Sequence, residues 1–196
     1  MTNIKINQVK DIYDDMLMKF PNTLKNTSMD KNKQSLDKYM TMCETKVVDF
    51  DTFKNEFVKN LKLTTAPRSC DAVYMTKYNE LFMIEFKNGI IEALKEYKIK
   101  TKIYESLLIL CEKLSQTIEY TRDNLSFILV YNEDVEHGPK QYEDTGLDKI
   151  QTALFKLANI HIIRFGLNHF KKLYFKEVYT YTKAEFESEF VSKYCT

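Results

Sequence analysis

Two extended runs separated by a turn-forming residue constrain the fold of this chain more than any other feature. Residues 72–78 and 81–87 are rich in β-branched and aromatic side chains, and Asn79 lies between them. Such runs favour paired strands, so we expect a β-hairpin here. Asn88 and Gly89 stop the second strand.

Helical and extended patterns are interspersed along the rest of the chain. Apolar residues at helical spacing predict helices over residues 4–19, 52–62, 90–120 (with a break near 98–101) and 147–158, and a closing helix that carries Phe186 and Phe190. Apolar or alternating runs predict further strands over residues 126–131, 160–165 and 173–182. Polar residues predict loops over residues 22–46 and 132–146. The pattern indicates an α/β (α+β) fold with one central mixed sheet flanked by helices.

The length of 196 residues is that of one ordinary domain. We expect residues 1–50 to form an N-terminal helix and a mobile polar segment packed on the core, and residues 51–196 to form the core itself. Only four Gly and three Pro are present, which argues against an all-β fold with many tight turns. The longest apolar stretch, residues 106–111, is too short to span a bilayer, and the N-terminus lacks a signal-peptide core. We therefore expect a cytoplasmic protein without a membrane partner.

Composition also excludes several functional classes. The net charge of +1 argues against a strongly basic nucleic-acid binder, although a local basic groove stays open. The chain lacks the GxxxxGK[ST], GxGxxG and GxSxG patterns of nucleotide-binding loops, dinucleotide-binding folds and hydrolase elbows. The cysteines form no CxxC pair, so a zinc site is unsupported and reduced thiols are expected. They are Cys43, Cys70, Cys111 and Cys195.

The residues that carry chemistry lie on the predicted hairpin. Asp71 opens the first strand, and Glu85 and Lys87 close the second. Residues two apart in a strand point to the same face, so Glu85 and Lys87 share a face. A loop of three or five residues puts Asp71 on that face too, whereas a two-residue loop at Asn79 and Glu80 turns it away. The sequence leaves both arrangements open.

Two carboxylates and one ammonium suit metal-assisted hydrolysis of phosphodiester bonds. Asp71 and Glu85 would supply oxygen ligands for Mg²⁺, or Mn²⁺ in its place. The metal would polarise a phosphoryl oxygen and acidify a bound water. Lys87 would position that water and offset negative charge in the transition state. We expect Glu56, on the helix over residues 52–62, as a third metal ligand. The alternative without a functional role is that these residues form a solvated hairpin edge with an incidental charge pair.

The same segment resembles the PD-(D/E)xK nuclease superfamily, which has a restriction-endonuclease-like core. Cys70-Asp71 resembles the "PD" element, with Cys in place of Pro, and Glu85-Phe86-Lys87 resembles the "ExK" element. The resemblance implies a core of a helix, a three-stranded meander, a helix and a further strand. We match these to residues 52–62, the hairpin, and the segments 90–120 and 126–131. The first strand of the meander would lie in residues 63–70 or 46–50.

The resemblance also implies roles for individual residues. Asp71 and Glu85 would bind metal, and Lys87 would be catalytic. The helix that follows would contribute an auxiliary group; Lys100, Lys102 and Tyr104 stand where it could come from, and of these we select Lys102. The stretch over residues 52–190 also resembles a group of uncharacterised proteins, which implies a shared fold and no established activity.

Three functional hypotheses stay open. The first is a Mg²⁺-dependent nuclease that acts on DNA or RNA, in the cytoplasm, nucleoid or nucleus. The second is a catalytically inactive member of the fold that serves as a protein-interaction or nucleic-acid-binding module. The third is a structural homodimer that uses an aromatic surface. Nothing in the sequence determines the oligomeric state.

Overall fold

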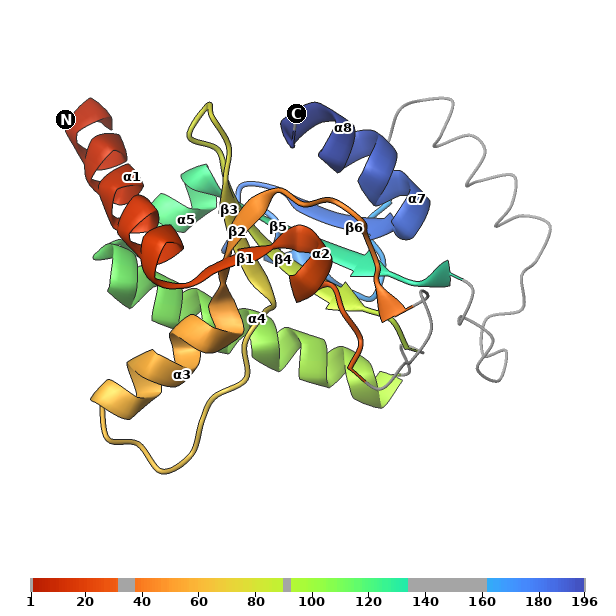
Figure 1. The fold of residues 1–196 in the computed structure, drawn as a ribbon, viewed down its shortest axis with the longest axis horizontal. Helices are drawn as coiled ribbons and strands as arrows, with labels where there is room; N and C mark the ends of the chain where they lie inside the picture. The colour runs from red at the N-terminus through yellow and green to blue at the C-terminus, as the bar shows by residue number, and fades with distance from the viewer. Residues whose placement is uncertain (1, 32–37, 90–92, 134–161, 196) are drawn as a thin grey trace.

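The computed structural model describes residues 2–31, 38–89, 93–133 and 162–195 (Figure 1). Within these residues, six strands form one mixed sheet in chain order. The strands are β1 (Pro21–Thr23), β2 (Lys46–Asp49), β3 (Ala72–Met75), β4 (Leu81–Lys87), β5 (Leu125–Tyr131) and β6 (Val178–Thr182). From β1 to β4 each strand is antiparallel to the next, whereas β4, β5 and β6 are parallel. This is the α/β domain with a mixed sheet that the sequence predicts.

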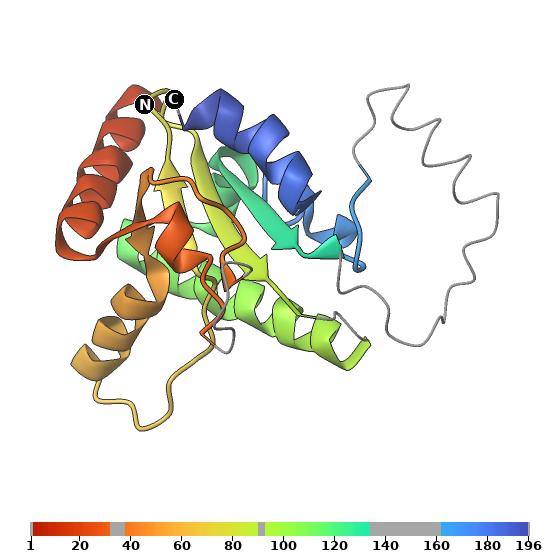
Figure 2. The same ribbon diagram turned by 45° about the vertical axis from the view of Figure 1, so that its right-hand side comes forward.

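Helices cover both faces of this sheet. On one face lie α1 (Thr2–Lys19), α3 (Phe50–Asn60) and α4 (Ala93–Leu114), which enclose the larger of two apolar cores. The opposite face packs against a closing helical run of α7 (Lys183–Glu185), η4 (Phe186–Val191) and α8 (Ser192–Tyr194). Figures 1 and 2 both show α4 and this closing run on opposite sides of the strands. Shorter elements complete the described chain: α2 (Leu24–Thr27), α5 (Ile118–Asn124) and η3 (Asn168–Phe170).

The predicted hairpin is confirmed, and its turn has five residues. Met75 pairs with Leu81, so residues 76–80 form the connection. Thr76 N donates to the carbonyl oxygen of Glu80 at 2.9 Å and closes the turn. Asn79 has a φ of 62°, in the left-handed region that Asn tolerates better than most residues.

Alternation along β4 fixes which side chains face α4. Leu81 and Met83 belong to the core under α4. Phe82, Ile84 and Phe86 belong to the core on the opposite face. Glu85 and Lys87 have the same parity as Leu81 and Met83, so they point toward the α4 side of the sheet.

Local signals explain where the first helices begin and end. α1 ends at Lys19, just before Pro21, which cannot continue a helix. Asp49 begins α3 by accepting a hydrogen bond from Thr52 N at 2.9 Å. β1 pairs with β2, and β2 pairs with β3, so strands from both sides of the boundary expected at residue 50 belong to one sheet.

One predicted break is wrong. α4 runs without interruption past residues 98–101 and ends at Leu114. Ile99 and Ile103 are buried against the sheet, and this packing outweighs the weak helix propensity of β-branched residues. The break comes instead at Ser115, whose φ of 53° is incompatible with a continuing helix.

The expected order of the first core helix and the first core strand needs correction. β2 lies at residues 46–49, within one of the two ranges that the sequence allowed, but it precedes α3. The helix over residues 52–62 therefore does not lead into the meander, as expected, but connects its first and second strands. The helix that precedes β2–β3–β4 in the chain is α1, together with the short α2.

Two predicted strands in the C-terminal part, over residues 160–165 and 173–182, are wrong in part; residues 160 and 161 lie outside the described residues. Residues 162–165 form no strand in the described chain. Arg164 N donates to Thr180 Oγ1, and that hydroxyl donates to the carbonyl oxygen of Ile162, each at 3.0 Å. A side chain thus satisfies backbone groups that a strand would have paired. The strand expected over 173–182 begins only at Val178. The predicted helix 147–158 and the acidic loop from residue 134 lie outside the described residues.

Among the helices of the described ranges, none is both long enough and apolar enough to cross a bilayer.

Candidate active site

A pair of carboxylates lies between the sheet and α4. Asp71 immediately precedes β3, and its backbone N–H donates to the carbonyl oxygen of Ile84 at 3.1 Å. The ladder ends at the pair Ala72 and Ile84, and the Asp71 carboxylate lies beside Glu85, where Lys102 contacts both acids. The five-residue turn thus puts both acids on one face, the first of the two arrangements that the sequence left open.

Each carboxylate is held by a specific donor. Asp71 Oδ2 accepts a hydrogen bond from the backbone N–H of Phe86 at 2.6 Å. Glu85 Oε1 accepts one from Lys102 Nζ of α4 at 2.7 Å. The same ammonium lies 3.9 Å from Asp71 Oδ1, so one cation faces both acids.

Exposure differs sharply within the group. The side chain of Glu85 is 2% exposed, that of Asp71 18% and that of Lys102 30%. Glu85 Oε2 is buried and finds no hydrogen-bond partner among the described residues. A buried carboxylate oxygen that receives no donor favours the protonated form of the acid pair over the doubly charged one.

Burial and mutual repulsion shift the protonation of the pair. Burial, with the neighbouring Asp71 carboxylate, raises the pKa of Glu85 to about 8. Burial also raises the pKa of Asp71 to about 6, although Lys102 and the Phe86 N–H oppose the shift. Burial alone would lower the pKa of Lys102. The two carboxylates raise it by more than burial lowers it, so the pKa of Lys102 lies above the usual lysine value. The pair holds a proton near neutral pH beside a charged ammonium.

A second set of contacts fixes the segment that carries Asp71. Cys70 N donates to Ser106 Oγ of α4 at 2.7 Å, and both residues are buried. Ser69 Oγ donates to Asp51 Oδ1 in the first turn of α3. Asp51 in turn raises the pKa of Asp71. The approach to β3 is therefore attached to both helices that flank the site.

Sequence reasoning missed Asp51 and Ser106. Nothing in the spacing of Asp51 indicates a contact with residue 69. Ser106 carried a detectable signal, because it is a polar residue between the buried Ile103 and Leu107 of an otherwise apolar helix face. A buried hydroxyl needs a partner, and here the partner is the backbone of Cys70.

Only some of the site residues predicted from the sequence lie together in the structure. Asp71, Glu85 and Lys102 form one contact group. Lys87 ends β4 on the same face, is half-buried, and lowers the pKa of Glu85 through its charge. Glu56 is exposed on α3 and is not brought into the group.

The donor set bears on whether a metal can bind. In the described part of the chain, no cluster of three or more His, Cys, Asp or Glu side chains could hold a metal ion. Asp71 and Glu85 alone offer hard oxygen donors of the kind that Mg²⁺ and Mn²⁺ prefer, and Mg²⁺ commonly binds one or two carboxylates and keeps several waters. The partnerless Glu85 Oε2 and the partly exposed Asp71 fit such an ion.

Comparisons of the chain with protein-family models, with curated proteins and with solved structures gave no significant match.

Proposed function

We propose that the protein is a PD-(D/E)xK-like, Mg²⁺-dependent nuclease that hydrolyses phosphodiester bonds. The observation that carries the proposal is the carboxylate pair: Glu85 is buried beside Asp71, and one of its oxygens lacks a partner in the described structure. Such an arrangement destabilises a fold, and ionisable groups with strongly perturbed pKa values cluster at functional sites. The order of a meander β2–β3–β4, then α4, then β5, also supports the proposal.

In this proposal Asp71 and Glu85 hold the ion. The N–H of Phe86 fixes Asp71, and the packing around Glu85 fixes the second carboxylate. When bound, Mg²⁺ would supply a Lewis acid for the phosphoryl oxygen and acidify a coordinated water. Binding of the dication requires both carboxylates to be ionised, so the pair must release the proton that it holds near pH 7.

Two lysines are available for the remaining roles. Lys87 matches the position that the family resemblance assigns to the catalytic lysine. Lys102 lies closer to the acids, at 2.7 Å from Glu85, and is exposed enough to reach a bound phosphate. We assign Lys87 to positioning the attacking water and Lys102 to neutralising the acids before the metal binds and the phosphate afterwards.

A second candidate function is favoured by Lys102 itself. Its ammonium already faces both carboxylates, as a metal ion would, and the described residues offer no third acid to outcompete it. A protein in which this lysine replaces the metal permanently would be an inactive nuclease fold, used as a protein-interaction or nucleic-acid-binding module. Either function fits a protein of the cytoplasm, nucleoid or nucleus, with DNA or RNA as partner, as a monomer or a homodimer.

Calorimetry and cleavage assays on the full chain separate the two candidates. Wild type is titrated with Mg²⁺ and Mn²⁺ at pH 8, then incubated with single- and double-stranded DNA and RNA. We expect metal binding that Asp71→Asn removes, and cleavage that Lys87→Ala abolishes without a change in circular dichroism. Glu112→Gln, an exposed acid on α4, serves as the control and keeps both properties.

The outcomes are distinct. Metal binding without cleavage of any substrate would favour the binding module. Failure of wild type to bind either ion would refute the metal site, and cleavage that persists in Lys87→Ala would refute the role of that lysine.

A further inference from the structure

A second chemically reactive cluster lies on the opposite face of the sheet from the carboxylates. Its members are Cys43, before β2, and Cys195, just after α8. Both are partly exposed, whereas Cys70 and Cys111 are buried. The two segments are about 150 residues apart in the chain, so only the tertiary structure brings them together.

Thr45 links the two cysteines. Cys43 Sγ donates to Thr45 Oγ1 at 3.3 Å, and Thr45 Oγ1 donates to the carbonyl oxygen of Cys195, also at 3.3 Å. A single hydroxyl therefore contacts both cysteine residues. Both side chains pack against the same apolar core, next to Tyr194.

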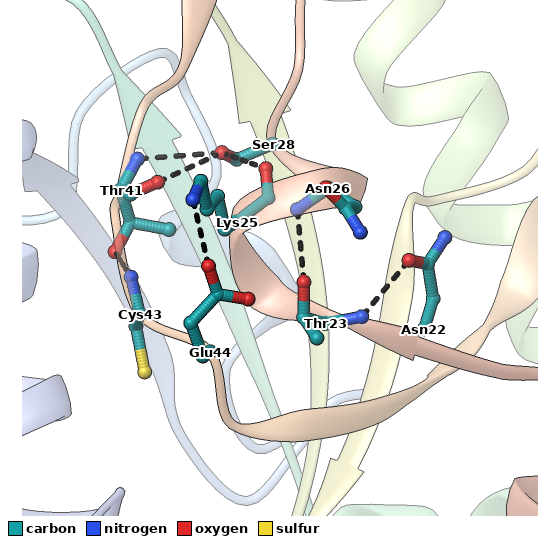
Figure 3. A network of polar contacts seen from close by, with 8 residues as sticks. All are labelled: Asn22, Thr23, Lys25, Asn26, Ser28, Thr41, Cys43 and Glu44. Carbon is teal, nitrogen blue, oxygen red and sulfur yellow. Dashed lines mark hydrogen bonds and ion pairs between the residues drawn. The ribbon is translucent and has the colours of Figure 1, made fainter.

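The segment that carries Cys43 is held rigidly. Figure 3 shows a network of polar contacts around Ser28 and Thr41 from which the sulfur of Cys43 points away. The N–H of Cys43 donates to Thr41 Oγ1 at 3.1 Å, and its carbonyl accepts from Lys25 N at 2.8 Å. The thiol is thus presented from an ordered backbone.

The segment that carries Cys195 is held as well. Tyr74 Oη donates to the carbonyl oxygen of Tyr194 at 2.6 Å, and Cys195 N donates to the carbonyl oxygen of Val191 at 3.0 Å. Two backbone anchors therefore flank the second thiol. A disulfide requires the two sulfurs to approach to a bonding distance of about 2 Å, and rotation about the two Cα–Cβ bonds is the movement that can bring them together.

We propose that Cys43 and Cys195 are a redox modification site, at which a reversible disulfide joins the segment before β2 to the closing helical run. The oxidant is a low-molecular-weight disulfide. One thiolate attacks it, forming a mixed disulfide and expelling one small thiolate. The other cysteine, as thiolate, then attacks the protein sulfur of the mixed disulfide and expels the second small thiolate. The two protons of the cysteines end on the two small thiols, so the protein loses two electrons and the small disulfide gains them.

The surroundings set the speed of this reaction. Burial and the neighbouring Cys43 raise the pKa of Cys195 to about 12. Thiolate is the attacking form, so closure is slow near pH 7 and accelerates as the pH rises. The bond would close a loop of about 150 residues, and such a cross-link stabilises mainly by restricting the unfolded chain.

Oxidation of the full chain with excess oxidised glutathione at pH 8.5 tests the proposal. We expect the protein to lose the mass of two hydrogen atoms and to yield a cross-linked peptide containing Cys43 and Cys195. We also expect its Tm to rise by roughly 5 °C or more, reversibly with dithiothreitol. Cys43→Ser and Cys195→Ser should show no rise in Tm, while Cys111→Ala, the matched control, keeps it.

Two results would overturn the proposal. The first is alkylation of both Cys43 and Cys195 in wild type after oxidation, which shows that neither thiol has reacted. The second is stable glutathione adducts on these cysteines without the cross-linked peptide, which shows that the thiols cannot meet. Mapping in wild type decides the matter even if a serine variant fails to fold.

Discussion

Replacing Lys102 by Met is the sharpest test of the charge arrangement between the sheet and α4. Methionine keeps most of the apolar length of the side chain and removes the ammonium that lies 2.7 Å from Glu85 and 3.9 Å from Asp71. Breaking one side of a buried ion pair typically costs about 3–5 kcal/mol. Because Lys102 is 30% exposed and water can partly replace it, we expect a loss of about 3 kcal/mol at pH 8.5, where both acids of wild type are mostly ionised.

The cost must depend on pH. In wild type the pKa of Asp71 is about 6 and that of Glu85 about 8, and loss of the ammonium raises both further. At pH 5 both carboxyls are already protonated, so the substitution removes only a hydrogen bond and costs about 1 kcal/mol. For a chain of this size, the Tm should fall by roughly 3 °C at pH 5 and by roughly 6–12 °C at pH 8.5.

The assay is thermal unfolding followed by circular dichroism at the two pH values. Lys113→Met is the matched control, because Lys113 lies on the same helix, is equally exposed, and pairs with the exposed Asp15 at 3.8 Å. Its substitution should change the Tm by no more than about 2 °C at either pH. An equal loss for Lys102→Met at pH 5 and pH 8.5 would refute the reasoning, since it would mean that the lysine acts through packing alone.

Two further predictions concern the same site. Because the pKa of Glu85 in the folded protein lies above the ordinary glutamate value of 4.5, the folded protein binds the extra proton. Wild type therefore loses stability as the pH rises from about 4.5 to 8. By pH 7 this decline in the free energy of unfolding should amount to about 3 kcal/mol, and Glu85→Gln should abolish most of it. Denaturant titrations at several pH values measure the decline, and an unchanged pH profile in the variant would show that Glu85 does not cause it. Ser106→Ala should cost about 1–3 kcal/mol, because it leaves the buried N–H of Cys70 without its acceptor, and a variant as stable as wild type would show that water takes over the bond.

The spacing of apolar residues along the sequence was sufficient to predict most of the helices and strands. The alternation of residues 81–87 and the helical spacing of the segment that forms α4 predicted the elements and their buried faces, because a strand repeats every two residues and a helix every 3.6. It failed where a tertiary contact replaced a local preference. Ile99 kept α4 continuous by packing, and the Thr180 hydroxyl satisfied backbone groups where a strand was expected at residues 162–165.

The candidate site shows the same division. The sequence alone determined that Glu85 and Lys87 share a face, and it restricted Asp71 to two orientations. Only the tertiary structure decided between them, because the orientation depends on the length of the turn at residues 76–80.

Contacts between distant segments were beyond the sequence for a different physical reason. Lys102 reaches Glu85, and Cys43 approaches Cys195, only because helices pack on particular faces of the sheet. Such packing depends on how whole side-chain surfaces fit, which no local pattern records. The sequence therefore determined the elements and the chemistry that they carry, and the tertiary structure decided which of those groups meet and how strongly their protonation is perturbed.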